Sequence, residues 1–468
     1  MKSKVLKGGV SMALRQILSA LLSLLNTLVV ARILGPKQYG IVAISLGIFY
    51  FLTFVGKMGL NTYIVRKPDL AKREVEEILA FYNTVGVLLC FLIWLLAPVF
   101  GLWTGNSQVS TALRFLIPAI WFDMVGMVAS SMLERDLKFG KISFIFALSE
   151  ITNYALSLTL VIVYKNYLAA VSGYVLQFLV YAILAFFYNP VRWRLRWSFE
   201  SLAPACRYGF SYSSSNSILN LRSLTIPLFV SRFAGIEAAA IVNVALRVSQ
   251  KLLLLRAVIR NMSISVMAKL IGEPNSLNRA LNKGMLYQSL LMGSICAAFS
   301  GFSAWVIPTM FGQEWILSAK IFPFVGLSII ISALFDLQTS VLYASDHNGE
   351  VIKFSVVNIG LIWLSCLCFL PFFGVWGYCF AEMIALPSYY LVHRSLIKYF
   401  KVPNYKPTFL VILATLPPLF GGLWLSPLYN LLLMLLSYGI LLAVSSPVRQ
   451  ALVDVLGDRL TSILKRSA

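Results

Sequence analysis

Seven basic side chains lie inside long apolar segments of the chain, where a charge is costly. They are Arg15, Lys57, Arg222, Arg247, Lys251, Arg256 and Arg260. If these segments cross a bilayer, each charge at mid-depth costs about 2.5–3.5 kcal/mol on the insertion scale when it faces lipid. We therefore expect a wet cavity or a partner anion beside these groups, and the arginine fork suits a phosphate. Structural ion pairing is the alternative.

Three of the seven have a simpler explanation. Arg15 lies near the start of its apolar segment, and Arg256 and Arg260 lie near the end of theirs. Long basic side chains in such places can extend their charged ends to a membrane interface. The remaining four lie deeper. Two of them, Arg247 and Lys251, are four residues apart and would share one face of a helix.

Four acidic residues also lie inside apolar segments. They are Asp123, Glu150, Asp336 and Glu382. Asp123 and Asp336 each follow a phenylalanine and occupy matching places in the two halves of the chain. Each of the four acids could pair with a basic residue, or could bind a proton or a sodium ion that couples to transport. The sequence leaves both interpretations open.

No arrangement of residues typical of an enzyme stands out. The sequence has no HExxH zinc motif, no phosphate-binding P-loop, no dinucleotide-binding glycine pattern and no Ser/His/Asp set near a loop. The two histidines, His347 and His393, are far apart in the sequence. We therefore expect no catalytic residue, no metal site and no cofactor.

The composition indicates that the solvent of this chain is lipid. Hydrophobic residues make up 59% of the sequence and charged residues 12%, whereas soluble domains carry about 25% charged residues. The chain has 39 Lys and Arg against 18 Asp and Glu. In a membrane protein such an excess is typical of basic cytoplasmic loops, so we do not expect nucleic acid as a partner.

Apolar runs long enough to cross a bilayer, about 20 residues each, recur along the whole chain. They cover residues 9–33, 39–64, 78–101, 109–133, 141–164, 167–189, 207–231, 236–262, 284–308, 320–344, 351–373, 375–395, 407–425 and 428–447. Of the 39 Lys and Arg residues, 26 lie at the ends or in alternate gaps, six in the other gaps and seven within the runs. Basic residues collect in cytoplasmic loops. The pattern predicts an all-α polytopic integral membrane protein of about 14 transmembrane helices, with both termini in the cytoplasm.

One stretch of the sequence is repeated 200 residues later, with several residues in matching positions. Arg32 matches Arg232, Gly35 matches Gly235, and an Ile-Val pair follows each glycine at the same distance. This predicts an apolar helix, a tight turn and a second apolar helix in each half. We expect an N-terminal lobe at residues 1–200, a C-terminal lobe at 201–400, and two extra helices with a basic cytoplasmic tail at 401–468. Transporters often bind substrate between such parallel halves.

The first 70 residues resemble a known family signature. Ala31–Gly40, with the sequence ARILGPKQYG, and then Gly59-Leu60 and Val65-Arg66 are similar to the N-terminus of the bacterial polysaccharide transporter family. These O-antigen-type (Wzx-like) flippases belong to the MOP superfamily, together with the MATE exporters. The resemblance implies two six-helix lobes in a MATE-like V, plus two C-terminal helices. It also implies a central cationic cavity lined by the first two helices of each lobe.

The candidate substrate-binding residues fall in those helices, which are spans one, two, seven and eight. They are Arg15, Lys57, Arg222, Arg247 and Lys251. Arg15 matches the family by its place in the first span, and the others match only by the span that carries them. The resemblance implies a flippase that moves a polyprenyl-pyrophosphate-linked oligosaccharide across the bacterial inner membrane, for surface polysaccharides such as O-antigen, lipopolysaccharide or exopolysaccharide. Membrane lipid, a coupling ion, a polysaccharide polymerase and other pathway proteins are the partners it suggests.

Three other functions have to be weighed. A membrane polymerase or glycosyltransferase of the same pathway would need catalytic groups in a sizeable external loop, and the external gaps are short and nearly uncharged. A MATE-like exporter would have to bind small cations, which a cavity rich in Arg and Lys would repel. A membrane scaffold without transport activity is disfavoured, because it would not explain the basic residues deep within the apolar segments.

Overall fold

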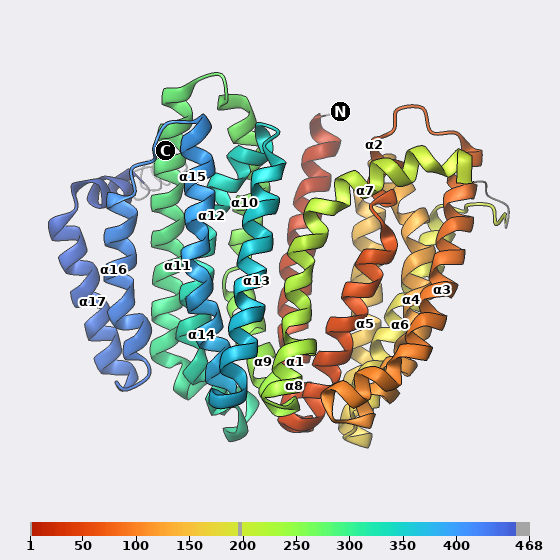
Figure 1. The fold of residues 1–468 in the computed structure, drawn as a ribbon, viewed down its shortest axis with the longest axis horizontal. Coiled ribbons are helices and arrows are strands. Elements are labelled where there is room, and N and C mark those ends of the chain that lie inside the picture. The colour runs from red at the N-terminus through yellow and green to blue at the C-terminus, as the bar shows by residue number, and fades with distance from the viewer. Residues whose placement is uncertain (1, 195–198, 455–468) are drawn as a thin grey trace, which may run out of the picture. The chain divides into compact units, whose positions relative to one another are not determined.

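The computed structural model describes residues 2–194 and 199–454 (Figure 1). Side chains are described for all of these except residues 2–18, 201, 208, 210–217, 219, 254, 255, 257, 258, 260, 261 and 265. This part of the chain forms helices, turns and short connections, and contains no strand. In hydrocarbon, backbone polar groups must bond within their own segment, so apolar runs of this length fold as helices. The all-helical fold expected from the sequence is confirmed.

The helices divide into two compact units, each described by itself. Unit 1 comprises Met1–Asn243 and Cys366–Val375, and unit 2 comprises Val244–Ser365 and Trp376–Ala468. The lobe boundaries expected from the sequence, near residues 200 and 400, remain a prediction. So does the basic character of the tail, because residues 455–468 lie outside the described part of the chain.

Unit 1 holds the first half of the predicted spans. Its elements are α1 (Lys2–Lys57), α2 (Leu60–Arg66), α3 (Lys72–Thr104), α4 (Ser107–Arg135), α5 (Phe139–Tyr164), α6 (Tyr167–Tyr188), α7 (Phe199–Leu221), the 3₁₀ turn η1 (Arg222–Leu224), the π-helical turn η2 (Thr225–Val230), α8 (Ser231–Phe233) and the first half of α9 (Ile236–Leu252). On α3, the exposed Leu88, Phe91 and Leu95 recur at helical spacing, while Tyr82 and Ile93 are buried. This helix therefore presents one apolar face to lipid and another to its unit.

Both copies of the repeated glycine form the expected turn. Gly35 has φ 66° and Gly235 has φ 92°, backbone conformations that L side chains rarely adopt. The helix after the first turn packs closely on the second copy. A Cβ at Gly47 would meet Pro227 Cγ at 2.7 Å, and one at Gly40 would overlap the carbonyl oxygen of Ile236. The two copies of the repeat thus touch within unit 1.

Unit 2 holds the remaining helices. Its elements are the second half of α9, α10 (Leu254–Leu270), α11 (Pro274–Phe311), η3 (Gln313–Trp315), α12 (Ile316–Ala344), most of α13 (Asn348–Phe373), α14 (Val375–Ala385), η4 (Leu386–Ser388), α15 (Tyr389–Tyr399), α16 (Lys406–Gly421) and α17 (Pro427–Val444). Figure 1 shows α17 beside α16, and α16 beside α11. The Ser300 hydroxyl on α11 donates to the Leu419 carbonyl oxygen (2.5 Å) and the Asn430 amide on α17 donates to that of Pro418 (3.0 Å). The two C-terminal helices are therefore packed onto unit 2 by specific hydrogen bonds.

Nine helices in the described part of the chain are long and apolar enough to cross a membrane. The first of these, α1, contains two predicted spans on either side of Gly35. Four other predicted spans are interrupted or shorter helices, formed by α7 to α8, α9 with α10, α14 with α15, and α16. The chain is thus a multi-pass membrane protein. The count of fourteen and the two-lobe arrangement remain predictions.

Candidate functional site

Lys57 and Asp123 form an ion pair inside unit 1. Lys57 ends α1, and the left-handed residues Met58 (φ 46°) and Gly59 (φ 68°) separate it from α2. Its Nζ lies 2.8 Å from Asp123 Oδ2 and 3.1 Å from Oδ1. The Tyr82 hydroxyl donates to the carbonyl oxygen of Lys57 (2.6 Å). Tyr82 thus hydrogen-bonds a backbone carbonyl group at the helix break, beside the ion pair.

An equivalent pair joins Arg256 and Asp336 in unit 2. Arg256 lies in the first turn of α10, three residues after Leu253 interrupts the helix. Its Nε lies 2.7 Å from Asp336 Oδ2. Extension to the membrane interface was one of two interpretations of Arg256, and the structure shows it in an ion pair. An arginine that bonds a carboxylate on a neighbouring helix is held in place by that bond.

In both pairs the basic side chain is the more exposed partner. Lys57 is 21% exposed and Asp123 6%, while Arg256 is 25% exposed and Asp336 14%. The two aspartates are therefore largely buried between helices, and the two basic side chains remain partly accessible to solvent. Removal of either partner would leave a buried charge unpaired, which is strongly destabilising.

The sequence carries a signal for Arg256 that its place near the end of an apolar run obscures. Lys57 follows Gly35 by 22 residues, and Arg256 follows Gly235 by 21. Their acidic partners both follow phenylalanine in the matching Phe-Asp dipeptides. Extending the repeat along the whole of each half would have placed Arg256 with the candidate substrate-binding residues.

The other candidate basic residues are half-buried or lie outside the described side chains. Arg222 begins η1 in unit 1, and the chain continues directly into the π-helical turn η2. Arg247 and Lys251 lie one turn apart on α9, in unit 2. All three are half-buried. The side chains of Arg15 and Arg260 lie outside the described residues, and the substrate-binding role of the set remains a prediction.

The remaining acids differ in their surroundings. Glu382, on α14, is buried and accepts hydrogen bonds from the hydroxyls of Ser328 (2.6 Å) and Tyr378 (2.6 Å). Just past it, η4 interrupts the helix, where the Asn358 amide donates to the Ser388 hydroxyl (2.9 Å). Glu150 is half-buried on α5. Neither acid's role in ion coupling is tested by this geometry.

The helix that carries Asp123 also holds the far end of α2. From the end of α4, Arg135 donates to the carbonyl oxygens of Ile64, Lys67 and Pro68. Nearby, Lys67 Nζ lies 2.7 Å from Glu74 Oε1, and this hydrogen-bonded carboxylate holds the pKa of Lys67 above its ordinary value. The far end of α2 is thereby fixed to α4, the same helix whose Asp123 pairs with Lys57 before α2 begins.

The described side chains include no group of three or more His, Cys, Asp or Glu that could hold a metal ion. What the two ion pairs themselves offer is charge pairing and hydrogen bonding. A partly accessible basic side chain can bind an anion. The carboxylate beside it would compete with that anion for the same basic group.

Comparisons with known proteins agree with this architecture. The chain is 21% identical to the lipopolysaccharide biosynthesis protein WzxC of Escherichia coli K12 over 343 residues, which cover 71% of this chain and 68% of the relative. Its fold matches that of the lipid II flippase MurJ, with a TM-score of 0.74, 15% identity and coverage of 92% of this chain and 97% of MurJ. It also matches an inward-facing MATE transporter of the MOP superfamily, with a TM-score of 0.62, 14% identity and coverage of 84% and 98%.

The match to a protein family covers more than half of the sequence. The family model described as polysaccharide biosynthesis protein matches residues 29–320, a range that begins just before the ARILGPKQYG signature and reaches into α12. The resemblance noted in the first 70 residues is thereby confirmed. The chain belongs to the polysaccharide biosynthesis protein family, on a MurJ- and MATE-like fold.

Proposed function

We propose that this protein is a flippase for a polyprenyl-pyrophosphate-linked oligosaccharide repeat unit, which it moves from the cytoplasmic to the outer face of the bacterial inner membrane. One combination of findings carries the proposal: a chain of the polysaccharide biosynthesis family has the fold of a lipid II flippase along 92% of its length. The family match supports a role in polysaccharide biosynthesis, and the fold match supports transport across a membrane.

The deep basic residues give this frame a suitable substrate. A pyrophosphate is a dense anion, and a partly desolvated arginine binds it through charge and paired hydrogen bonds. Arg15, Lys57, Arg222, Arg247 and Lys251 would line a cationic cavity between two lobes. The headgroup and sugars would enter it from the cytoplasmic side, while the lipid tail stays in the bilayer.

Alternating access would then carry the headgroup across. A ligand shifts a conformational equilibrium only by its different affinity for the two states. The anion offsets the cost of desolvating the basic groups only while it is bound, so binding would favour the closed form. A proton or sodium gradient would drive the return, with Asp123, Glu150, Asp336 and Glu382 as candidate ion sites.

The competing functions fit less well. An enzyme of the same pathway would need reactive groups held near the leaving sugar, and the turns at Gly105-Asn106 and Lys165-Asn166 join their helices within two residues. An exporter of small cations would have to overcome the repulsion of the basic groups. A polymerase acting beside this protein remains a candidate partner.

Deletion of the gene tests the proposal. The lipid-linked oligosaccharide should accumulate as complete repeat units on the cytoplasmic face, because synthesis continues while flipping stops. The measurement is accessibility of the sugars to a membrane-impermeant glycosidase in intact and everted vesicles, with the plasmid-borne gene as the control. Incomplete units, or complete unpolymerised units on the outer face, would instead identify an enzyme.

A further inference from the structure

The two ion pairs repeat one design in both units. In each, a basic residue beside a helix break meets an aspartate that follows phenylalanine in the middle of a long helix, α4 or α12. Lys57 and Arg256 also occupy nearly the same place after their glycine turns. A structural clamp needed in one unit alone would not have to recur at the same position in the other.

Each aspartate lies within a helix that is long and apolar enough to cross a membrane. Asp123 precedes Arg135, the end of α4, by 12 residues, and Asp336 precedes Ala344, the end of α12, by eight. At 1.5 Å per residue these distances are about 18 and 12 Å. Both ends lie on the side that the basic loops predict to be cytoplasmic. A headgroup that enters from that side would meet these cations early.

The bonding within the pairs leaves donors for a second anion. The bond from Arg256 uses Nε, so the terminal nitrogens Nη1 and Nη2 take no part in it. These two nitrogens form the fork that binds phosphate in a bidentate manner. Lys57 holds both oxygens of Asp123 with one ammonium group, and an ammonium readily exchanges one oxygen ligand for another.

We propose that Asp123 and Asp336 are internal counter-ions. Without substrate, each carboxylate neutralises its basic partner, and the pyrophosphate of the substrate displaces it. Each cation then exchanges one anion for another and is never left bare at membrane depth, and the returning carboxylate helps to release the product. The inference rests on the proposed function, and it adds Arg256 to the substrate-binding residues.

Binding measurements on the full-length protein in lipid nanodiscs test this inference. The probe is undecaprenyl pyrophosphate, and undecaprenol is the uncharged reference. Asp123→Asn and Asp336→Asn should each bind the probe more tightly, because the competing anion has gone. We expect about tenfold in Kd, equivalent to about 1.4 kcal/mol.

Two further variants complete the comparison. Asp136→Asn is the matched control, since Asp136 caps α4 and pairs with Lys138 outside the membrane segment, and it should bind like the wild type. Lys57→Met combined with Asp123→Asn keeps a neutral, similarly shaped pair without the cation, and it should bind more weakly than Asp123→Asn alone. Thermal unfolding of each variant shows whether it is folded.

The outcomes separate the two proposals. If the wild type does not prefer the pyrophosphate over undecaprenol, the proposed function and this inference both fail. If it does prefer it, but neither asparagine variant binds more tightly than the wild type, the counter-ion role alone is wrong. If both asparagine variants fail to fold while the neutral double variant folds, the pairs are structural clamps, which also overturns the inference.

Discussion

Arg222 marks a point where the backbone departs from regular α-helix. It starts the 3₁₀ turn η1, and the π-helical turn η2 with Pro227 follows at once. Irregular turns inside membrane helices are frequent at functional sites, because they leave backbone groups and side chains in positions a regular helix does not offer. A half-buried arginine at such a point is well placed to bind a ligand.

Replacement of Arg222 or Arg247 should stop export without blocking membrane insertion. Arg222→Ala and Arg247→Ala each remove a guanidinium that the proposed cavity uses for the pyrophosphate. Arg→Lys at either position should also impair export, because lysine keeps the charge but lacks the planar fork. Surface polysaccharide is measured by immunoblot, against the amount of protein in the membrane.

Arg73→Ala and Arg73→Lys are the matched controls for these variants. Arg73 is exposed, and its pair with Glu77 lies within one helix turn at the start of α3. The Arg73 side chain is 80% exposed, although that of Glu77 is only 9% exposed, and neither residue belongs to the proposed site. Both exchanges should therefore leave export unchanged. Normal export in both alanine variants, at Arg222 and at Arg247, would remove these residues from the proposed site.

The helices were more predictable from the sequence than the contacts between them. Hydropathy located the apolar segments, and the repeated glycine located two turns that the structure confirms at Gly35 and Gly235. Hydropathy does not show which way a side chain points around its helix. The partners of Lys57 and Arg256 are 66 and 80 residues away, so they had to come from the packing. The break at Leu253 was equally invisible, since leucines continue through it, whereas Gly59 marks the break at Met58 in the sequence.

At the scale of elements, the close approach of α1 to α9 sets the packing of the two repeat copies. Gly40→Ala should destabilise the protein, because the added methyl group would overlap the carbonyl oxygen of Ile236 and backbone would have to shift. Overpacking of this kind costs about 1–3 kcal/mol. The thermal unfolding midpoint of the purified protein in detergent measures the effect.

Gly140→Ala is the control for the substitution at Gly40. Gly140 lies in the first turn of α5, and a Cβ there would meet nothing within 4 Å. Alanine favours helix over glycine by up to about 1 kcal/mol, so this variant should unfold at the same temperature or slightly higher. A Gly40→Ala protein that is as stable as the Gly140→Ala protein would show that the contact between α1 and α9 is looser than described.

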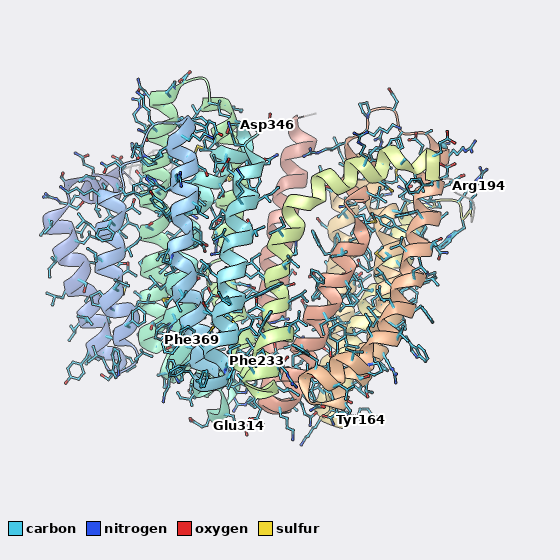
Figure 2. All side chains as sticks on the ribbon, viewed as in Figure 1. Tyr164, Arg194, Phe233, Glu314, Asp346 and Phe369 are labelled. Carbon is cyan, nitrogen blue, oxygen red and sulfur yellow. The ribbon has the colours of Figure 1, made fainter. Side chains whose placement is uncertain are left out.

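At the scale of the molecule, the distribution of basic residues assigns each helix end to one side of the membrane. Figure 2 shows Tyr164 and Arg194 at opposite ends of unit 1, and Glu314 and Asp346 at opposite ends of unit 2. Most Lys and Arg in the connections lie at the ends marked by Arg194 and Asp346. Because basic loops stay in the cytoplasm, these ends should be cytoplasmic, and Tyr164 and Glu314 should lie outside.

Cysteine labelling in intact cells tests this assignment in both units at once. Tyr164→Cys and Glu314→Cys should react with a membrane-impermeant maleimide, whereas Arg194→Cys and Asp346→Cys should react only after permeabilisation. The background is a variant whose six native cysteines are replaced by serine and whose export is retained. Equal labelling of both ends within one unit would mean that a helix between them does not cross the membrane. Reversed labelling in both units would place the basic loops outside, and the pyrophosphate could then not enter from the cytoplasm past Lys57 and Arg256.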